Sequence, residues 1–322
     1  MRVLSIVLVG ISLLWPAPVA AQEGNRYALI VQGASGEEQY ATQHRAWLDA
    51  LAQTLRDRLK FEPARLSILA EQATAGELRA TSENVKTVLG RLASEMKPTD
   101  LLLIVLIGHG GGSAADAKFN LVGPDLTIAE WSALLKPIAG RVAFVDTTSS
   151  SFAFLSGLAA PDRIVITATN SQAQRYHTMF PDGFIKALSS DAADVDKNGR
   201  ISLLEAFTHA SRLVGQHYEQ AGTMSTERAM VDDTGDGKGR DAVTEGPDGV
   251  VAGLTYLDSP AMATSSDPAV QQLLTRQQAL TQQVDDLRRR RPGMPAAEFD
   301  RQFETLIIEL ALVSREVRQK KK

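Results

Sequence analysis

The stretch "LLLIVLIGHGGG", residues 101–112, runs from seven consecutive aliphatic residues into a glycine, His109 and three further glycines. A run that is apolar at every position, and not only at every second one, predicts a strand buried on both faces, as in the interior of a parallel sheet. In open parallel sheets, ligands bind beyond the carboxyl ends of the strands. His109 is therefore the first candidate functional residue.

Similar apolar runs predict the other strands of this sheet. They lie at residues 26–33, 65–72, 141–148 and 162–170, with a shorter strand at 118–123. Amphipathic patterns around Trp47 and over residues 82–96 and 127–138 predict helices between them. Apolar strands that alternate with helices predict an α/β fold, a mainly parallel sheet with helices on both faces.

The composition excludes several kinds of chemistry. The 322 residues include no cysteine, so the chain offers no thiol nucleophile, no thiolate metal ligand and no disulfide. With 44% hydrophobic and 22% charged residues, the chain can form one large domain or two smaller ones. Its formal net charge of -4 gives no support for a nucleic-acid partner.

The first residues predict export. Arg2 precedes an apolar run, two prolines follow, and Val19 and Ala21 provide the small residues of a cleavage site. This pattern predicts a secretory signal peptide at residues 1–21 and a periplasmic or secreted mature protein. The alternative is a retained anchor, but the run is too short to span a membrane, and no later segment is long and apolar enough.

The last sixty residues predict a separate unit. A domain at residues 22–260 is followed by two helical patterns at 261–322, separated by "RRRRPGMP". Each pattern carries one apolar seam, so the two helices are expected to close as an antiparallel, coiled-coil-like hairpin. The hairpin either stabilises the fold or is a docking arm for self-association. The seams consist of Val270, Leu273, Leu280, Val284 and Leu287, and of Phe299, Phe303, Leu306, Leu310, Val313 and Val317.

A His-Gly pair after one strand and small hydroxyl residues after the next resemble the caspase-hemoglobinase fold, shared by caspases, legumain, metacaspases and bacterial relatives. The resemblance covers residues 26–220. It implies that His109 and Gly110 correspond to the His-Gly of the catalytic dyad. It also implies that "DTTSSS", residues 146–151, corresponds to a pattern like acid-Ala-Cys-x-Ser-Gly. Asp146 then stands at the acidic position, Thr148 at the nucleophilic cysteine, Ser150 at the serine and Ser151 at the glycine.

Threonine in place of cysteine favours an inactive protein, because a hydroxyl has a far higher pKa than a thiol and needs a base in direct contact. We therefore expect a caspase/legumain-like pseudo-peptidase that binds a peptide or protein in the inherited cleft at His109, Thr148 and Asn170. Two alternatives stay open. One is a scaffold that acts through the C-terminal hairpin. The other is an active endopeptidase that uses Thr148, Ser149, Ser150 or Ser151 with His109 as base and backbone amides from Gly110 onward at the oxyanion.

Two other functions fail on spacing. "GHGGG" also resembles the oxyanion motif of esterases, but the chain has no G-x-S-x-G nucleophile elbow. Neither "GHGGGS" nor "GDGKGR" has the spacing of a phosphate-binding P-loop.

The segment "DVDKNGRISLLE", residues 194–205, matches the calcium loop of EF-hands. It predicts a structural Ca²⁺ ion held with an affinity of roughly 0.1 to 1 mM, the range of extracellular modules. The alternative is a charged loop that caps the next helix. The expected ligands are Asp194, Asp196, Asn198, the Arg200 carbonyl, Ser202 and Glu205.

The remaining acidic and histidine residues give weaker signals. Residues 232–241 are acidic and glycine-rich, and Asp232, Asp233 and Asp236 either bind a second ion or belong to a solvated loop. None of the histidines has a metal-ligand spacing such as H-E-x-x-H. Surface or helix-packing roles are therefore expected for His44, His177, His209 and His217.

Overall fold

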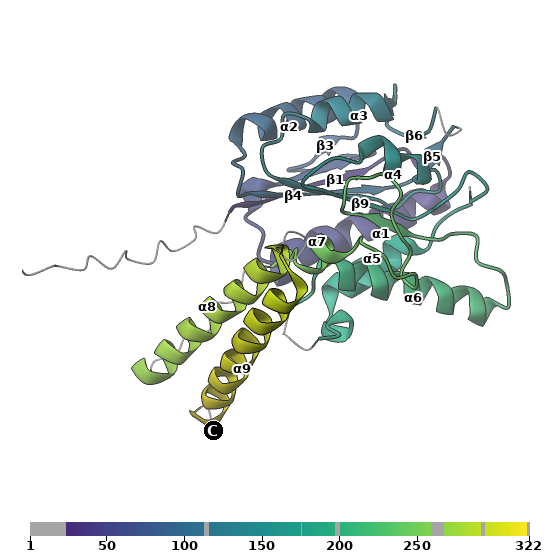
Figure 1. The fold of residues 1–322 in the computed structure, drawn as a ribbon. Coiled ribbons are helices and arrows are strands. Elements are labelled where there is room, and N and C mark those ends of the chain that lie inside the picture. Colours follow the sequence, from purple (N-terminus) through teal and green to yellow (C-terminus); the bar gives the residue numbers. More distant parts are fainter. Residues whose placement is uncertain are drawn as a thin grey trace, which may run out of the picture.

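The computed structural model describes residues 24–112, 116–174, 176–196, 200–258, 267–290 and 294–320. The predicted signal peptide and Asn198 lie outside these ranges. Within them, seven strands form one sheet in the order β10-β9-β8-β4-β1-β2-β3 (Figure 1). All neighbours are parallel except β10, which is antiparallel to β9. The strands are β1 (Arg26–Gln32), β2 (Leu66–Ala70), β3 (Leu78–Arg79), β4 (Leu101–Ile107), β8 (Arg141–Asp146), β9 (Arg163–Thr167) and β10 (Met230–Asp232).

The sheet confirms the predicted α/β class and the five long strands. β4 is its central strand, and six of its seven residues are buried, as the unbroken apolar run predicts. The short strand predicted at 118–123 belongs instead to a small antiparallel sheet beyond the end of β4. That sheet consists of β5 (Gly110–Gly111), β6 (Lys118–Phe119) and β7 (Leu126–Thr127).

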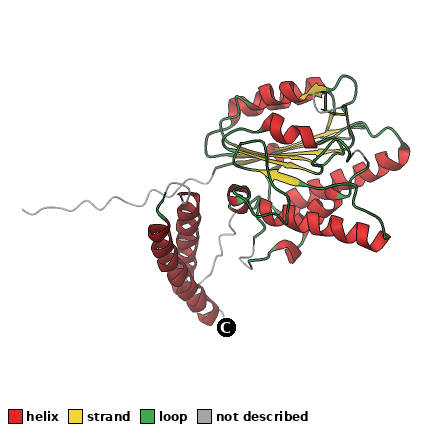
Figure 2. Cartoon of the chain, turned by 45° about the vertical axis from the view of Figure 1, so that its right-hand side comes forward, coloured by secondary structure: helices red, strands yellow, loops and turns green. Residues whose placement is uncertain are grey.

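Helices cover both faces of the main sheet (Figures 1 and 2). One core lies between the sheet and α1, α5 and α6, and the other lies between the sheet and α2, α3 and α4. Because side chains alternate along each strand, β4 contributes to both cores. The helices are α1 (Glu38–Gln53), α2 (Ser82–Glu95), α3 (Ile128–Leu135), α4 (Phe152–Leu158), α5 (Phe180–Ser189), α6 (Leu203–Ala221) and the short α7 (Val250–Gly253). Single turns, η1 (Thr54–Arg58), η2 (Pro63–Arg65) and η3 (Asp191–Ala193), join some of them.

The C-terminal segment forms two helices that lie side by side, α8 (Pro268–Arg290) and α9 (Ala296–Lys320) (Figure 1). A small apolar core joins them, with Val270 and Leu280 of α8 buried beside Val313 and Val317 of α9. Gln277 Nε2 donates to Ser314 Oγ over 2.8 Å between the helices. None of the helices in the described ranges is both long and apolar enough to cross a membrane.

Candidate functional site

β4 ends at the carboxyl edge of the sheet and delivers His109 there. The chain turns at Gly108, whose φ of +145° favours glycine, and the His109 carbonyl then accepts a hydrogen bond from Asn120 N at 3.0 Å. The next residue, Gly110, packs directly against the end of β8. A Cβ atom at Gly110 would lie 2.7 Å from Thr148 Oγ1 and 2.9 Å from Ser150 Cβ. Close packing against β8 therefore accounts for this glycine.

Thr148 follows β8, as the resemblance implies, but its side chain is enclosed. The residue is 0% exposed, and its hydroxyl makes no well-formed hydrogen bond within the described part of the chain. Its backbone N–H donates to Asp146 Oδ1 over 3.0 Å. In this arrangement no hydrogen bond joins the His109 ring to the Thr148 hydroxyl within the described part of the chain.

Of the neighbouring serines, Ser151 forms hydrogen bonds with the local backbone. Ser151 Oγ donates to the Thr148 carbonyl over 2.7 Å and lies 3.0 Å from Thr169 Oγ1. Ser149 and Ser150 are 7% and 5% exposed. Hydroxyls that bond backbone carbonyls in a buried turn stabilise that turn.

Asp146, at the acidic position of the resemblance, is fully buried at the end of β8. Burial raises the pKa of its carboxyl group to about 6, against the opposing effect of the Thr148 N–H and hydroxyl. The carboxylate holds the turn after β8 through its bond to the Thr148 amide.

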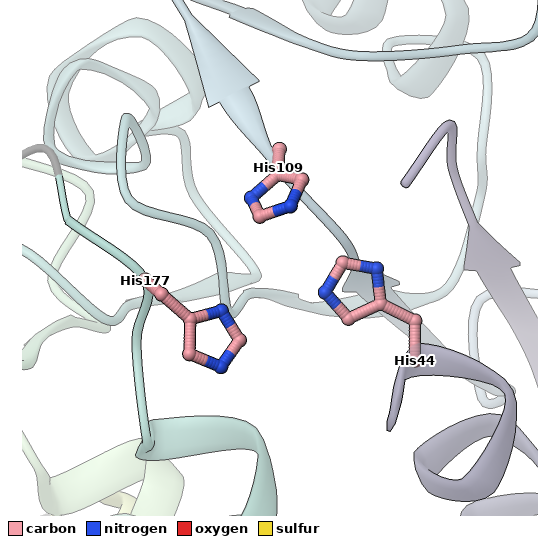
Figure 3. Close-up of side chains that lie close together, drawn as sticks. All are labelled: His44, His109 and His177. Atoms are coloured by element: carbon pink, nitrogen blue, oxygen red, sulfur yellow. The ribbon is translucent and has the colours of Figure 1, made fainter. Parts of the chain in front are cut away.

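His109 lies beside two other histidines, His44 and His177, which come from α1 and from the loop after β9 (Figure 3). One ring nitrogen of each lies within 4.8 Å of those of the other two. Ring centroids are 4.9 Å apart for His44 and His109 and 6.1 Å apart for His109 and His177. The expectation that His44 and His177 have only surface or packing roles missed this cluster.

Ser35 lies beside two of the three imidazoles. Its hydroxyl is 3.0 Å from His44 Nδ1, and its backbone carbonyl lies close enough to the His109 ring to raise the pKa of that ring. Gln32 Nε2 donates to the same hydroxyl over 3.1 Å, so the hydroxyl keeps one lone pair and its own O–H for His44 Nδ1. When His44 Nδ1–H donates to Ser35, its Nε2 carries the lone pair that a ligand could take.

Two aromatic residues of α1 enclose the cluster. Tyr40 meets the His109 ring edge-on at 4.7 Å, and Trp47 stacks on His177 at 5.6 Å with 4° between the ring planes. Tyr40, His44 and Trp47 occupy positions i, i+4 and i+7, one face of a helix. That spacing, on the helix that follows the first strand, was the available sequence signal.

The environment keeps the three imidazoles neutral. Burial, followed by repulsion from His109 and His177, lowers the pKa of His44 to about 3. Burial also lowers the pKa of His109, against the opposing effects of the Ser35 carbonyl and Glu37. It lowers the pKa of His177 too, with a further effect of His109. At neutral pH each ring therefore carries a lone pair on one nitrogen.

The calcium-loop segment brings together three of its predicted ligands. Carboxylate oxygens of Asp194, Asp196 and Glu205 lie within 4.8 Å of one another. Glu205 Oε1 accepts from Val195 N at 2.9 Å, and Glu205 Oε2 accepts from both the N–H and the hydroxyl of Ser202 at 2.9 Å. The Ser202 hydroxyl thus caps α6, and the Arg200 side chain pairs with Asp258 over 3.0 Å.

In the second acidic segment, Asp232 and Asp236 lie near Asp248. Asp232 accepts the N–H groups of Gly235 and Gly237 at 2.8 and 2.6 Å. Asp233 faces the start of α7, where it accepts Gly249 N and Ala252 N at 2.9 and 2.7 Å. The Asp232 carboxylate stabilises the loop, and the Asp233 carboxylate accepts backbone N–H groups at the start of α7.

Comparison with known proteins found likenesses in structure but no match in sequence. The sequence matches no protein-family model and no curated protein. The structure is similar to that of protein GSU0716 from Geobacter sulfurreducens, with a TM-score of 0.42 and 14% identity over 69% of this chain and 95% of that one. It is also similar to the Drosophila initiator caspase Dronc, with a TM-score of 0.41 and 11% identity over 74% of this chain and 94% of that one.

Proposed function

We propose that this protein is an exported, caspase-like pseudo-peptidase, which binds a peptide or protein ligand without hydrolysing it. The burial of Thr148 carries the proposal. A hydroxyl nucleophile needs both access to substrate and a base in contact with it. Thr148 is 0% exposed, and within the described ranges no histidine forms a hydrogen bond with its hydroxyl. The same burial disfavours the active endopeptidase.

A cavity of about 450 Å³ between α5, α6 and residues 225–243 supports a binding role. Phe180, Val214 and Ala229 give it an apolar lining, and Gln174 and Arg228 give it polar groups. Gln174 comes from the loop after β9, and its Oε1 accepts from both Asn170 N and Arg228 N, at 2.9 and 3.2 Å. An apolar pocket with a few polar groups suits a side chain of an extended peptide.

Filling this cavity should abolish peptide binding. Gly215 of α6 lines the cavity, and open space surrounds the position of its missing Cβ. Gly215→Trp should therefore fill the cavity without a backbone clash, while Gly215→Ala should leave room for the ligand. The measurement is affinity selection of a random peptide library on immobilised protein in the presence of a chelator.

Gly90→Trp on α2 is the matched control, because that glycine also has open space around it. The proposal is supported if Gly215→Trp fails to retain peptides that the other three proteins retain. Those three are wild type, Gly215→Ala and Gly90→Trp. Equal retention by all four proteins would contradict it.

The proposed absence of peptidase activity is tested by incubating wild type, His109→Ala and Thr148→Cys with the same peptide library. New peptide termini are then sequenced by mass spectrometry. We expect no cleavage from any of them, because the residue at position 148 is fully buried. Cleavage by wild type that persists in chelator and disappears in His109→Ala would establish a hydroxyl nucleophile.

We also propose that the loop at 194–205 binds a structural Ca²⁺ ion. Calcium at 5 mM should stabilise the protein by about 1–2 kcal/mol, by mass action on a site of millimolar or submillimolar affinity. Thermal unfolding with and without Ca²⁺ measures this. Asp194→Asn and Glu205→Gln should remove the effect, and Asp236→Asn should keep it. A wild-type melting temperature that does not respond to calcium would refute the site.

A further inference from the structure

The histidine cluster is assembled from three separate parts of the chain. His44 lies on α1, His109 follows β4 and His177 follows β9, yet their ring nitrogens meet within 4.8 Å (Figure 3). The calcium proposal does not involve these residues, and the peptide-binding proposal does not explain why they meet.

The inward nitrogen of His44 has no hydrogen-bond partner. His44 is 0% exposed, and its Nε2 is buried without a partner in the described ranges, as is Nε2 of His177. A buried polar atom left unpaired costs about 1–3 kcal/mol. A ligand that accepts a lone pair from His44 Nε2 would offset that cost for this atom.

The outward nitrogen of His44 is already held. Its Nδ1 lies 3.0 Å from the Ser35 hydroxyl, to which Gln32 Nε2 donates over 3.1 Å. Metal-binding histidines in proteins are oriented in this way, by a hydrogen bond on the ring nitrogen that does not face the ion.

We propose that His44, His109 and His177 bind one divalent transition-metal ion, with Zn²⁺ as the best match. Three imidazoles and no carboxylate favour Zn²⁺, Co²⁺, Ni²⁺ or Cu²⁺ over Ca²⁺ and Mg²⁺, which prefer oxygen ligands. Three protein ligands leave a fourth tetrahedral position for water or a group of a bound ligand.

The fit requires a small movement. Zn–N bonds of 2.0–2.1 Å in a tetrahedral site place ligand nitrogens about 3.3 Å apart. The separations here are at most 4.8 Å, so closure by about 1.5 Å or less is needed. Ring rotations of His109 and His177, both partly exposed, can supply it.

Metal binding would also give His109 a function that does not require a nucleophilic residue at position 148. Its inward nitrogen would hold the ion, and its other nitrogen would stay beside the Ser35 carbonyl. The His-Gly of the sequence would then serve a binding site in place of a dyad.

The test is titration of the tag-free mature protein with Zn²⁺ and Co²⁺ in 5 mM CaCl₂, which saturates the acidic loops. We expect one ion per chain by calorimetry and the visible absorption of tetrahedral Co²⁺. Ser35→Ala should weaken binding about 10- to 100-fold. His109→Ala and His177→Ala should weaken it more and remove the Co²⁺ absorption.

His209→Ala and His217→Ala, on α6, are the matched controls and should bind as wild type does. The test uses a His177 variant and not a His44 variant. His44 lies in the core, where its replacement can unfold the protein, whereas His177 is only half-buried. Any of three results would overturn the proposed site. They are a wild-type protein that binds no Zn²⁺, Zn²⁺ binding that persists in His177→Ala, and a loss of Zn²⁺ binding in His209→Ala. Peptide binding is measured separately with Gly215→Trp in chelator, so the two proposals fail independently.

Discussion

Replacing Gly110 with alanine should lower the free energy of unfolding by about 1–3 kcal/mol, the usual cost of overpacking a buried contact. The new Cβ would lie 2.7 Å from Thr148 Oγ1, 2.9 Å from Ser150 Cβ and 3.1 Å from the Lys118 carbonyl. Thr148 and Ser150 are buried, so neither can move into solvent. Urea unfolding of Gly110→Ala beside wild type measures the cost.

The neighbouring glycine provides the control. A Cβ at Gly111 would meet only Asn120 Oδ1, at 3.5 Å, so Gly111→Ala should be nearly neutral. Thr148→Ala should recover part of the loss in the Gly110→Ala background, as a coupling of about 0.5 kcal/mol or more. Equal stability of Gly110→Ala and Gly111→Ala would show that the contact with Thr148 is not a constraint. The expected result would show that close packing requires a glycine at position 110.

The long strands could be predicted because a strand that is buried on both faces has apolar residues at nearly every position. The runs at 26–33 and 101–107 are apolar almost throughout, and both strands are buried in the sheet. β3 and β10 were missed because strands of two or three residues are too short to show a period. The run at 118–123 was found, but periodicity does not specify which sheet a short strand joins.

The candidate site could be predicted only in part. His109 and Thr148 end neighbouring strands, so their location at the same edge followed from the parallel order. His44 and His177 are brought there by the path of α1 and by the loop after β9, which local sequence patterns do not encode. The burial of Thr148 and its contact with Gly110 of β5 depend on packing between segments far apart in the sequence, which local patterns do not encode either.

The stability of this protein should fall by about 3 kcal/mol between pH 4.5 and pH 8 through one buried carboxyl group, that of Glu227. Burial raises the pKa of Glu227 to about 7, from an ordinary value of 4.5 in an unfolded chain, although three hydrogen bonds oppose the shift. Those bonds come from Met179 N at 2.7 Å and Phe180 N at 3.0 Å, where α5 begins, and from the Tyr218 hydroxyl at 3.2 Å.

The sign follows from proton binding. Between the two pKa values the folded state holds a proton on Glu227 that the unfolded state has released. The stabilisation is therefore complete below pH 4.5 and is lost as the pH rises through about 7. Glu227→Gln carries no titrating proton, so its free energy of unfolding should lose this pH dependence. Its NH2 group cannot accept the N–H bond that one carboxylate oxygen accepts, so the change with pH, and not the absolute stability, is the quantity to compare.

The difference between the wild-type and Glu227→Gln unfolding energies, measured in urea from pH 4.5 to pH 8, isolates this group. Asp146, whose pKa is also raised, titrates in both proteins and cancels. Glu219→Gln removes an exposed carboxylate of α6 and is the control, which should keep the wild-type pH profile. Parallel curves for wild type and Glu227→Gln would mean that α5 holds Glu227 as a carboxylate throughout. Because Glu227 also lines the cavity proposed for a peptide, its ionisation would then place a fixed negative charge beside the bound side chain.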